Sequence, residues 1–401
     1  MAIASGIKTT VEYTEEATQG VTPGSPTMQL LRATGRNINL RKSAIESAEP
    51  SLTRQTVEVR QGFNQTVGEL GFELTTDNFN DMFRFLLGGS TAAAWTAYTA
   101  VGNSAGCNVT APSTITRTSG NWITDGYRPG DWLDGSAWTT SSGANNQRVR
   151  ITSIAGTGAG AITVDSTTLV TEAAAVGKQF VGVGKFLKVS SVFKTFTLER
   201  AFTDLSEFQV FRGCTANTCR MSARPDALLT GSFGILGLSA LLNNASALAT
   251  PVSAIANSPM ATFEASVIAG GSLLNAVTAF DMLIDNQRGI QPVVGSKFSP
   301  EVFDGTCKIT GTFASMFQND SFMVFFENET TLNPLQLKGL DPNGDFIAFS
   351  VFRPKFTGHE IDPPTQGPVL QQVPWQATLQ SFSNGSTTFQ EAFRIQRSTS
   401  T

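Results

Sequence analysis

An internal repeat constrains the fold of this chain more than any other feature of its sequence. Residues 61–88 (QGFNQTVGELGFELTTDNFNDMFRFLLG) align without a gap with residues 300–327 (PEVFDGTCKITGTFASMFQNDSFMVFFE), at a constant offset of 239 positions. Three identities anchor the alignment: Asn80, Asp81 and Phe83 coincide with Asn319, Asp320 and Phe322. Apolar alternation alone can match by chance in a β-rich chain, but a constant offset that includes identities favours a duplicated β-unit.

Each copy of the repeat predicts a strand with one apolar face and one polar face. In the second copy, Ile309, Gly311 and Phe313 alternate with Lys308, Thr310 and Thr312. In the first copy, Leu70 and Leu74 fall on the apolar face, and Glu69 and Glu73 fall on the polar face. The apolar run that follows, at 322–326 in the second copy, predicts either a short helix or a buried strand, because periodicity does not decide between them.

The composition argues against several classes of function. Charged residues make up 15% of the 401 residues, against about a quarter in typical chains, and the net charge is −4. The sequence has no basic run, RNP-like motif or zinc-finger spacing, so it does not predict a protein that grips nucleic acid. It has no apolar stretch of the roughly 18 residues that a membrane helix needs, and its N-terminus lacks a signal-peptide core. We therefore expect no membrane partner and synthesis in a cytoplasm.

The sequence also offers no metal site, cofactor site or catalytic constellation. It contains one histidine, His359, and four cysteines, of which Cys214 and Cys219 lie close enough to bridge, although a reducing compartment favours thiols. These residues are too few for a zinc site, and the segment GVGKF lacks the spacing of a phosphate-binding loop. A histidine base would need an oriented nucleophile, and no Gly-x-Ser-x-Gly elbow supplies one. We therefore expect no metal, no cofactor and no enzymatic activity.

Composition divides the chain into four parts. Residues 1–89 and 185–245 are predicted to form a first, discontinuous domain, residues 246–262 a linker, and residues 263–401 a second domain. Residues 90–184 interrupt the first domain with short alternating strands and Gly turns, which predicts an inserted, outward-facing β-domain. We expect three of its aromatic residues on its surface: Trp122, Trp132 and Trp138.

Several motifs together resemble a known family. Tyr13, Glu16 and Gly20 form a Tyr-x-x-Glu-x-x-x-Gly opening, and GELGFELTTDNFNDMFRFLLG follows it. The segments DMLIDN and GTCKITGTFASMF and the ending at 358–375 lie in the second half, and GDWL, RVRITSI and ITVD lie in the insert. These segments resemble the major tail tube proteins of siphoviruses, the long-tailed non-contractile bacteriophages, of the Chi-like type with two tandem tube domains. The insert resembles the decorating β-domains of phage tail proteins.

The resemblance implies a mainly β fold with two tandem tube domains, each a β-sandwich or barrel with a short flanking helix. It implies a structural virion protein, made in the host bacterial cytoplasm, whose strands pair edge to edge between copies. The copies form stacked rings, which build the hollow tail conduit for DNA ejection. Two tube domains per chain imply homotrimeric rings with pseudo-sixfold symmetry, and a single domain would imply hexamers.

The resemblance also implies partners and sites. The expected partners are other copies of the chain, a tape measure protein, double-stranded DNA held without tight binding in the lumen, and tail terminator and tail tip proteins. The candidate lumen or inter-ring residues are those of the repeated polar face: Glu69, Glu73, Lys308, Thr310 and Thr312. Acidic groups in a lumen would repel DNA phosphates, although the second copy carries no acid at these places. An alternative function is a β-sandwich adhesin or carbohydrate-binding module that uses the Trp-rich insert.

Overall fold

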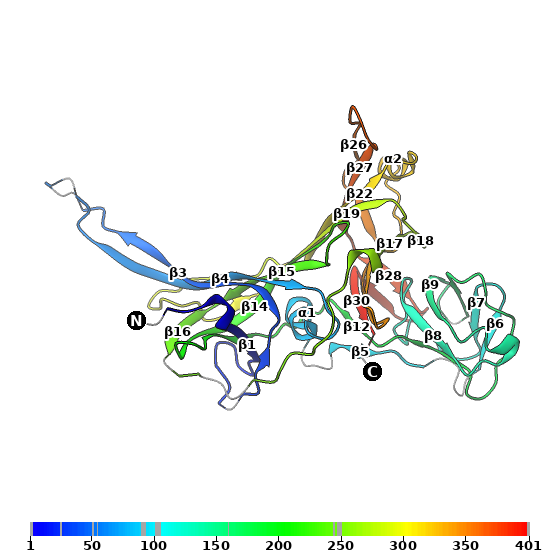
Figure 1. Cartoon of the computed structure of the whole chain (residues 1–401), viewed down its shortest axis with the longest axis horizontal. Coiled ribbons are helices and arrows are strands. Elements are labelled where there is room, and N and C mark those ends of the chain that lie inside the picture. The colour runs from blue at the N-terminus through cyan, green and yellow to red at the C-terminus, as the bar shows by residue number, and fades with distance from the viewer. Residues whose placement is uncertain are drawn as a thin grey trace.

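The computed structural model describes residues 3–24, 26–49, 52–53, 55–89, 94–100, 106–158, 160–243, 245–246 and 251–398. The described chain is mainly β-structure, as predicted, and its strands form three large sheets and two small hairpins (Figure 1). The two α-helices in the described ranges are short: α1 (Asn80–Leu87) and α2 (Ser321–Glu327).

The largest sheet has thirteen strands and contains both copies of the repeat. Its central run, in spatial order, is β3 (Ala33–Glu46), β4 (Val59–Glu73), β15 (Thr230–Gly237), β14 (Glu207–Ala223), β19 (Val277–Asp285), β22 (Lys308–Met316), β27 (Leu370–Ala377) and β25 (Pro354–Phe356). The remaining strands are β1 (Thr9–Glu15), β2 (Gln29–Leu30), β13 (Phe196–Phe202), β16 (Ser239–Asn243) and β26 (Glu360–Asp362). Neighbouring strands of the central run are antiparallel, so each strand presents alternate side chains to the core.

The long strand β14 belongs to two layers at once. Its first half pairs with β13 and β16, and its second half pairs with β15 and β19. The seven-stranded sheet lies in the second half of the molecule. Its strands are β18 (Ser272–Leu273), β17 (Ser266–Ala269), β23 (Leu335–Leu340), β24 (Phe346–Val351), β30 (Phe393–Arg397), β12 (Lys185–Lys188) and β5 (Thr96–Ala97). One continuous hydrophobic core contacts this sheet, both helices and the central run.

The two copies of the repeat have the same local structure. In each copy an antiparallel strand pair, β3–β4 or β19–β22, leads into a short helix. The predicted apolar positions Leu70, Leu74, Ile309 and Phe313 are all buried. The aromatic run at 322–326 is a helix, α2, so the first of the two predicted alternatives holds.

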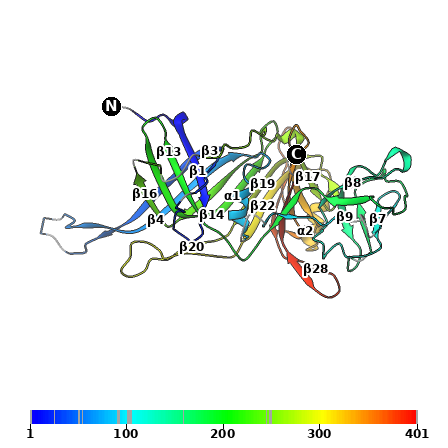
Figure 2. The ribbon, with the colours of Figure 1, turned by 90° about the horizontal axis from the view of Figure 1, so that it is seen from below.

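The insert folds around a core of its own at one end of the molecule (Figures 1 and 2). Its six-stranded sheet comprises β6 (Cys107–Thr110), β7 (Thr114–Arg117), β8 (Trp132–Ser136), β9 (Arg148–Ile154), β10 (Ala161–Val164) and β11 (Gln179–Gly182). The flanking strands β5 and β12 pair with each other, and β12 pairs with β30. The segment after the insert therefore joins the seven-stranded sheet, although its sequence position placed it in the first predicted domain.

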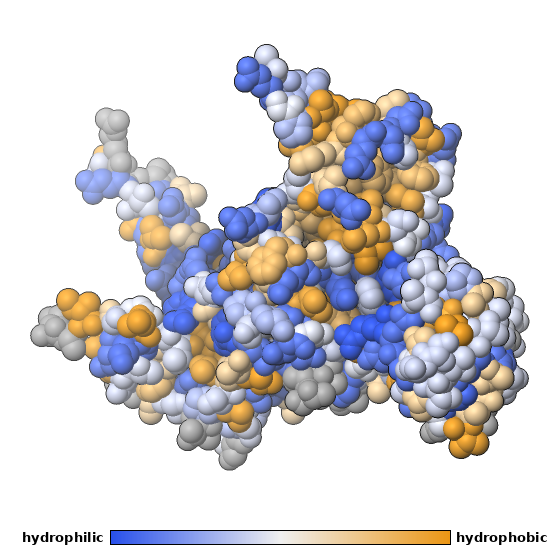
Figure 3. Space-filling model, turned by 45° about the vertical axis from the view of Figure 1, so that its right-hand side comes forward, coloured by the Kyte–Doolittle hydropathy of each residue, from blue (hydrophilic) through white to orange (hydrophobic). Residues whose placement is uncertain are grey.

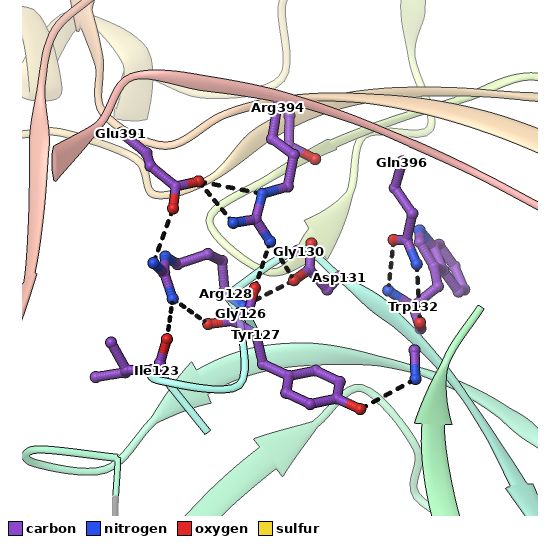
Figure 4. Close-up of polar contacts among 12 residues, drawn as sticks. Ile123, Gly126, Tyr127, Arg128, Gly130, Asp131, Trp132, Glu391, Arg394 and Gln396 are labelled. Atoms are coloured by element: carbon purple, nitrogen blue, oxygen red, sulfur yellow. Dashed lines mark hydrogen bonds and ion pairs between the residues drawn. The ribbon is translucent and has the colours of Figure 1, made fainter. Parts of the chain in front are cut away.

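A buried ion network fastens the insert to the second half of the chain (Figure 4). Arg394 lies 2.9 Å from Asp131 of the insert and 2.6 Å from Glu391, and Arg128 of the insert lies 2.8 Å from Glu391. All four side chains are almost completely buried. The two guanidinium groups lower the pKa of Glu391 although burial alone would raise it.

Three hairpins project from the body of the molecule. The β3–β4 hairpin extends far to one side, opposite the insert, and the β26–β27 hairpin points upward beside α2 (Figure 1). The small hairpin of β28 (Gln380–Ser383) and β29 (Thr388–Glu391) points away in the second view (Figure 2). Another small strand pair joins β20 (Gly289–Ile290) and β21 (Val302–Phe303).

Candidate functional site

The exposed face of the central run brings together all five residues of the predicted polar face. Antiparallel pairing aligns its side chains in rows that cross from strand to strand. One row contains Asn37, Glu69, Gly234, Thr218, Asp285 and Lys308. The next contains Gly35, Gly71, Ser232, Arg220, Leu283, Thr310 and Gln376. A third contains Glu73, Thr230, Ser222, Asp281, Thr312 and Pro374.

This face is made mainly of small and uncharged groups. Its middle is hollowed into a cavity of about 830 Å³, lined by residues of β14, β15, β19, β22 and β27. The acidic residues of the three rows are accompanied by Arg220 and Lys308, and Asp281 forms an exposed ion pair of 2.6 Å with Arg224. The face therefore mixes both signs of charge and contains no basic cluster of the kind that binds DNA tightly.

The sequence prediction covered only the repeated strand and therefore did not include the whole of this face. The strands β14 and β19 lie between the two copies and contribute Arg220, Asp281 and Asp285. The alternation of buried Phe280, Met282 and Ile284 with the residues between them would have identified the polar side of β19.

Both ends of the central run are open edges. In the described part of the chain, β3 pairs with β4 alone, and β25 pairs with β27 alone. An unpaired edge exposes backbone N–H and C=O groups that can pair with another strand. The sheet can therefore be extended at both ends by strands of other molecules.

The structure corrects the prediction that three aromatic residues lie on the surface of the insert. Trp122 and Trp138 are almost fully buried in the insert core, where their indole N–H groups donate to the carbonyls of Gly160 and Gln179. Trp132 is partly buried against the seven-stranded sheet, and Lys338 lies 3.6 Å from its ring centroid. These indoles are used for packing, so the Trp-based ligand face of the adhesin alternative is not present.

The remaining chemistry is sparse. Cys214 and Cys219 are free, buried thiols on the one strand β14. Nε2 of His359 donates a hydrogen bond of 3.0 Å to the side-chain amide oxygen of Gln371. Within the described ranges, no three His, Cys, Asp or Glu side chains gather closely enough to hold a metal ion. The search of those same residues also found no helix of the length and apolarity needed to span a membrane.

The fold thus defines a mainly β-protein with a repeated strand–helix unit and a polar, open-edged sheet. The comparison with protein families identifies which one. A family model described as phage tail tube protein matches residues 6–377, and the chain belongs to this family. It is thus a structural subunit of a phage tail tube, a component of the virion tail that assembles with other tail proteins, as predicted. No curated protein matches the chain.

Proposed function

We propose that three copies of this chain close into a ring in which the exposed face of the central run lines the lumen. The observation that carries the proposal is the central run itself, which is polar on one face and open at both edges. Heterologous pairing of the edge β3 with the edge β25 of the next copy closes a ring. Because each chain contributes two copies of the strand–helix unit, a trimer has pseudo-sixfold symmetry. Stacked rings then form the conduit.

The lumen assignment concerns Glu69, Glu73, Lys308, Thr310 and Thr312. These residues support it by lying on one face of the sheet, together with hydroxyl and glycine positions. Double-stranded DNA passes such a face without tight binding because few cations are available to replace its counterions. The rows hold four acidic residues and only two basic ones, Arg220 and Lys308, so DNA phosphates meet weak net repulsion and no strong attraction.

The wider context of the proposal follows from the family resemblance. We place the chain in a siphovirus tail, with synthesis in the host bacterial cytoplasm before assembly. Its partners are a tape measure protein inside the tube and terminator and tip proteins at the ends of the tube. The insert lies at the end of the molecule opposite the β3–β4 hairpin, which supports a position outside the ring (Figure 1).

Negative-stain electron microscopy of the concentrated full chain tests this proposal. We expect rings or tubes whose class averages show three outer lobes, one for each insert. Six lobes would replace the trimer with a hexamer and would contradict the reading of two tube domains per chain. A chain that remains monomeric at high concentration would contradict self-assembly through its own open edges.

A further inference from the structure

The two repeated helices differ sharply in how they are covered. In α1, Phe85 and Leu87 are buried. Their counterparts 239 positions later, Val324 and Phe326, are each 39% exposed, as is Met323. Hydrophobic colour gathers on the upper lobe of the molecule, where α2 and its neighbouring strands lie (Figure 3). One repeat therefore has a partner surface that the other lacks.

The cover of α1 comes from both halves of the chain. From the first half, Tyr13 and Phe196 pack against Phe85, with ring centroids 6.1 and 4.6 Å apart. Phe349 of β24 packs against Phe83 of α1, with ring centroids 5.7 Å apart. Arg288, which follows β19, donates to the carbonyl oxygens of Phe85 and Leu86 at 2.9 and 3.2 Å. Beside these contacts, the edge of the first half pairs with the second half through β14 and β19.

Each strand at this junction has a counterpart at an open edge. The strand β3 corresponds to β19, because Arg36 faces Leu70 as Ile284 faces Ile309. The strand β25 corresponds to the second half of β14. The buried Phe356 of β25 faces β27, and the buried Met221 of β14 faces β15. Each of these facing strands, β27 and β15, pairs with a copy of the repeated strand. The junction inside the chain is thus a template for a contact between two copies.

The first half of the chain has an open pocket at the place where the template predicts the helix of another copy. In the hairpin β23–β24, Phe349 faces Leu337. The hairpin β13–β14 of the first half has the same arrangement, in which Phe211 faces Leu198, so Phe211 is taken as the counterpart of Phe349. Phe211 lines a cavity of about 220 Å³ between β3 and β16, together with Leu241 and Leu242. These two leucines are 42% and 68% exposed. A partly apolar recess, whose lining also includes Asn39, Arg200 and Gln209, therefore lies where the template predicts a helix.

The charges beside the helix and the pocket are complementary. Exposed carboxylates flank α2 at Asp320 and Glu327. A third, Glu329, is already paired with Lys355 of β25 at 2.5 Å. Exposed cations lie on β3 at Arg41 and Lys42, beside the pocket. Opposite charges at the rim of an interface favour one orientation of the partners and increase the rate of association.

We propose that α2 of one copy docks in the β3–β16 pocket of a second copy, while β25 pairs beside β3. The contact is heterologous, since the two surfaces are different parts of the chain. This inference rests on the proposed ring assembly and names the side chains that hold adjacent copies together. On this template Phe322, the counterpart of Phe83, would contact Phe211. The exposed Val324 and Phe326 would become buried beside Leu241 and Leu242.

The test uses two single variants of the full chain, Val324→Asp on the helix and Leu242→Asp at the pocket. Each variant places a charge in the proposed interface, so each is expected to sediment as a monomer of 42.7 kDa while the wild type assembles. Val176→Asp on the insert, at a side chain that is 96% exposed, is the matched control and is expected to assemble normally. Unchanged melting temperatures show that the variants fold.

Mixing the two variants decides which surfaces meet. The Leu242→Asp copy retains an intact helix, and the Val324→Asp copy retains an intact pocket. One native interface can therefore form, so the mixture is expected to give dimers, twice the monomer mass, and no rings. Monomers in the mixture, or normal assembly by either variant, would overturn the inference. A wild type that never assembles would instead count against the proposed function.

Discussion

At the scale of single residues, the structure explains the motif at Tyr13, Glu16 and Gly20. The carboxylate of Glu16 is buried and accepts four hydrogen bonds of 2.7–2.9 Å. The donors are the backbone N–H groups of Gly20 and Gly213 and the hydroxyls of Thr195 and Thr197. One side chain thus joins the loop after β1 to β13 and β14.

We expect Glu16→Gln to destabilise the protein by about 1–3 kcal/mol, because the amide group would turn a donor toward a backbone N–H that also donates. The measurement is the free energy of unfolding from urea titration. Glu58→Gln, at an exposed ion pair with Arg60, is the control and is expected to change this free energy little. Equal effects of the two variants would contradict the structural role of Glu16.

A second buried carboxylate, Glu172, makes the insert sensitive to acid. Burial would raise its pKa, but Lys178 and the N–H groups of Thr139 and Thr140 outweigh burial and lower the pKa to about 2. Since the pKa is about 4.5 in the unfolded chain, this contribution to stability is fully present above pH 4.5. It is lost as the pH falls toward 2.

The melting temperature of the insert, followed by tryptophan fluorescence, should therefore fall between pH 4.5 and 2. Glu172→Gln should lower the melting temperature at pH 7 and flatten its decline with acid. Glu301→Gln, an exposed control, should keep the wild-type profile. A Glu172→Gln profile with the wild-type slope would show that another group titrates.

At the scale of secondary-structure elements, the two repeats place large and small residues in opposite order. Phe72 of β4 faces Gly231 of β15, whereas its counterpart Gly311 of β22 faces Trp375 of β27. The space that a glycine leaves in one strand is filled by the ring of the facing residue. The repeat could not predict this exchange, because β15 and β27 lie outside the aligned stretch.

We expect Gly311→Ala to destabilise the second half of the chain. A Cβ at this position would lie 2.3 Å from both the Asp281 carbonyl oxygen and Trp375 Cζ2, so the backbone itself must move. Overpacking of this kind costs about 1–3 kcal/mol. Gly289→Ala is a matched control, since nothing lies within 4 Å of its Cβ. Thermal unfolding of both variants tests the difference, and a neutral Gly311→Ala would contradict it.

The ion network between the insert and the second half gives another prediction. Arg394→Met leaves two carboxylates buried without their main cation, at a cost of about 3–5 kcal/mol. We expect this variant to expose the connections of the insert to limited proteolysis while the wild type resists. Arg148→Met removes a half-exposed ion pair with Asp134 and should resist cleavage. Equal resistance of the two variants would show that the network does not hold the insert.

These elements also show which parts of the fold the sequence could predict. Alternation predicted the strands of the repeat and their buried residues, because a half-buried strand records its two faces in its period. It did not place Trp122 and Trp138, because composition does not distinguish a domain core from a ligand face. The segment predicted as a linker contains the buried Met260, whose N–H donates to the Leu74 carbonyl at 2.8 Å. Such long-range pairings leave no local signal.

At the scale of the whole molecule, the proposal that the exposed face of the central run lines the lumen requires this face to tolerate DNA without retaining it. Its rows hold the acidic residues Glu69, Glu73, Asp281 and Asp285 beside the cations Arg220 and Lys308. The family match supports the role in a tail tube, which the sequence motifs had also indicated. The balance of positive and negative charges on this face could not be predicted from the sequence, because it depends on the pairing of strands that lie far apart in the chain. A lumen built from it would have little affinity for phosphate.

Reversing two of these charges should therefore convert a passive lumen into a binding one. In tubes of the Glu69→Lys, Glu73→Lys double variant, each chain presents lysines to the lumen in two rows, and these cations can release counterions from DNA. We expect the variant tubes to retain linear double-stranded DNA at low salt and to release it as salt rises, whereas wild-type tubes retain little at any salt. The control is Glu49→Lys, Glu58→Lys, which makes the same change in net charge on the exposed β3–β4 hairpin. If the control tubes bind DNA as strongly and with the same salt dependence, the face that carries Glu69 and Glu73 does not line the path of the DNA.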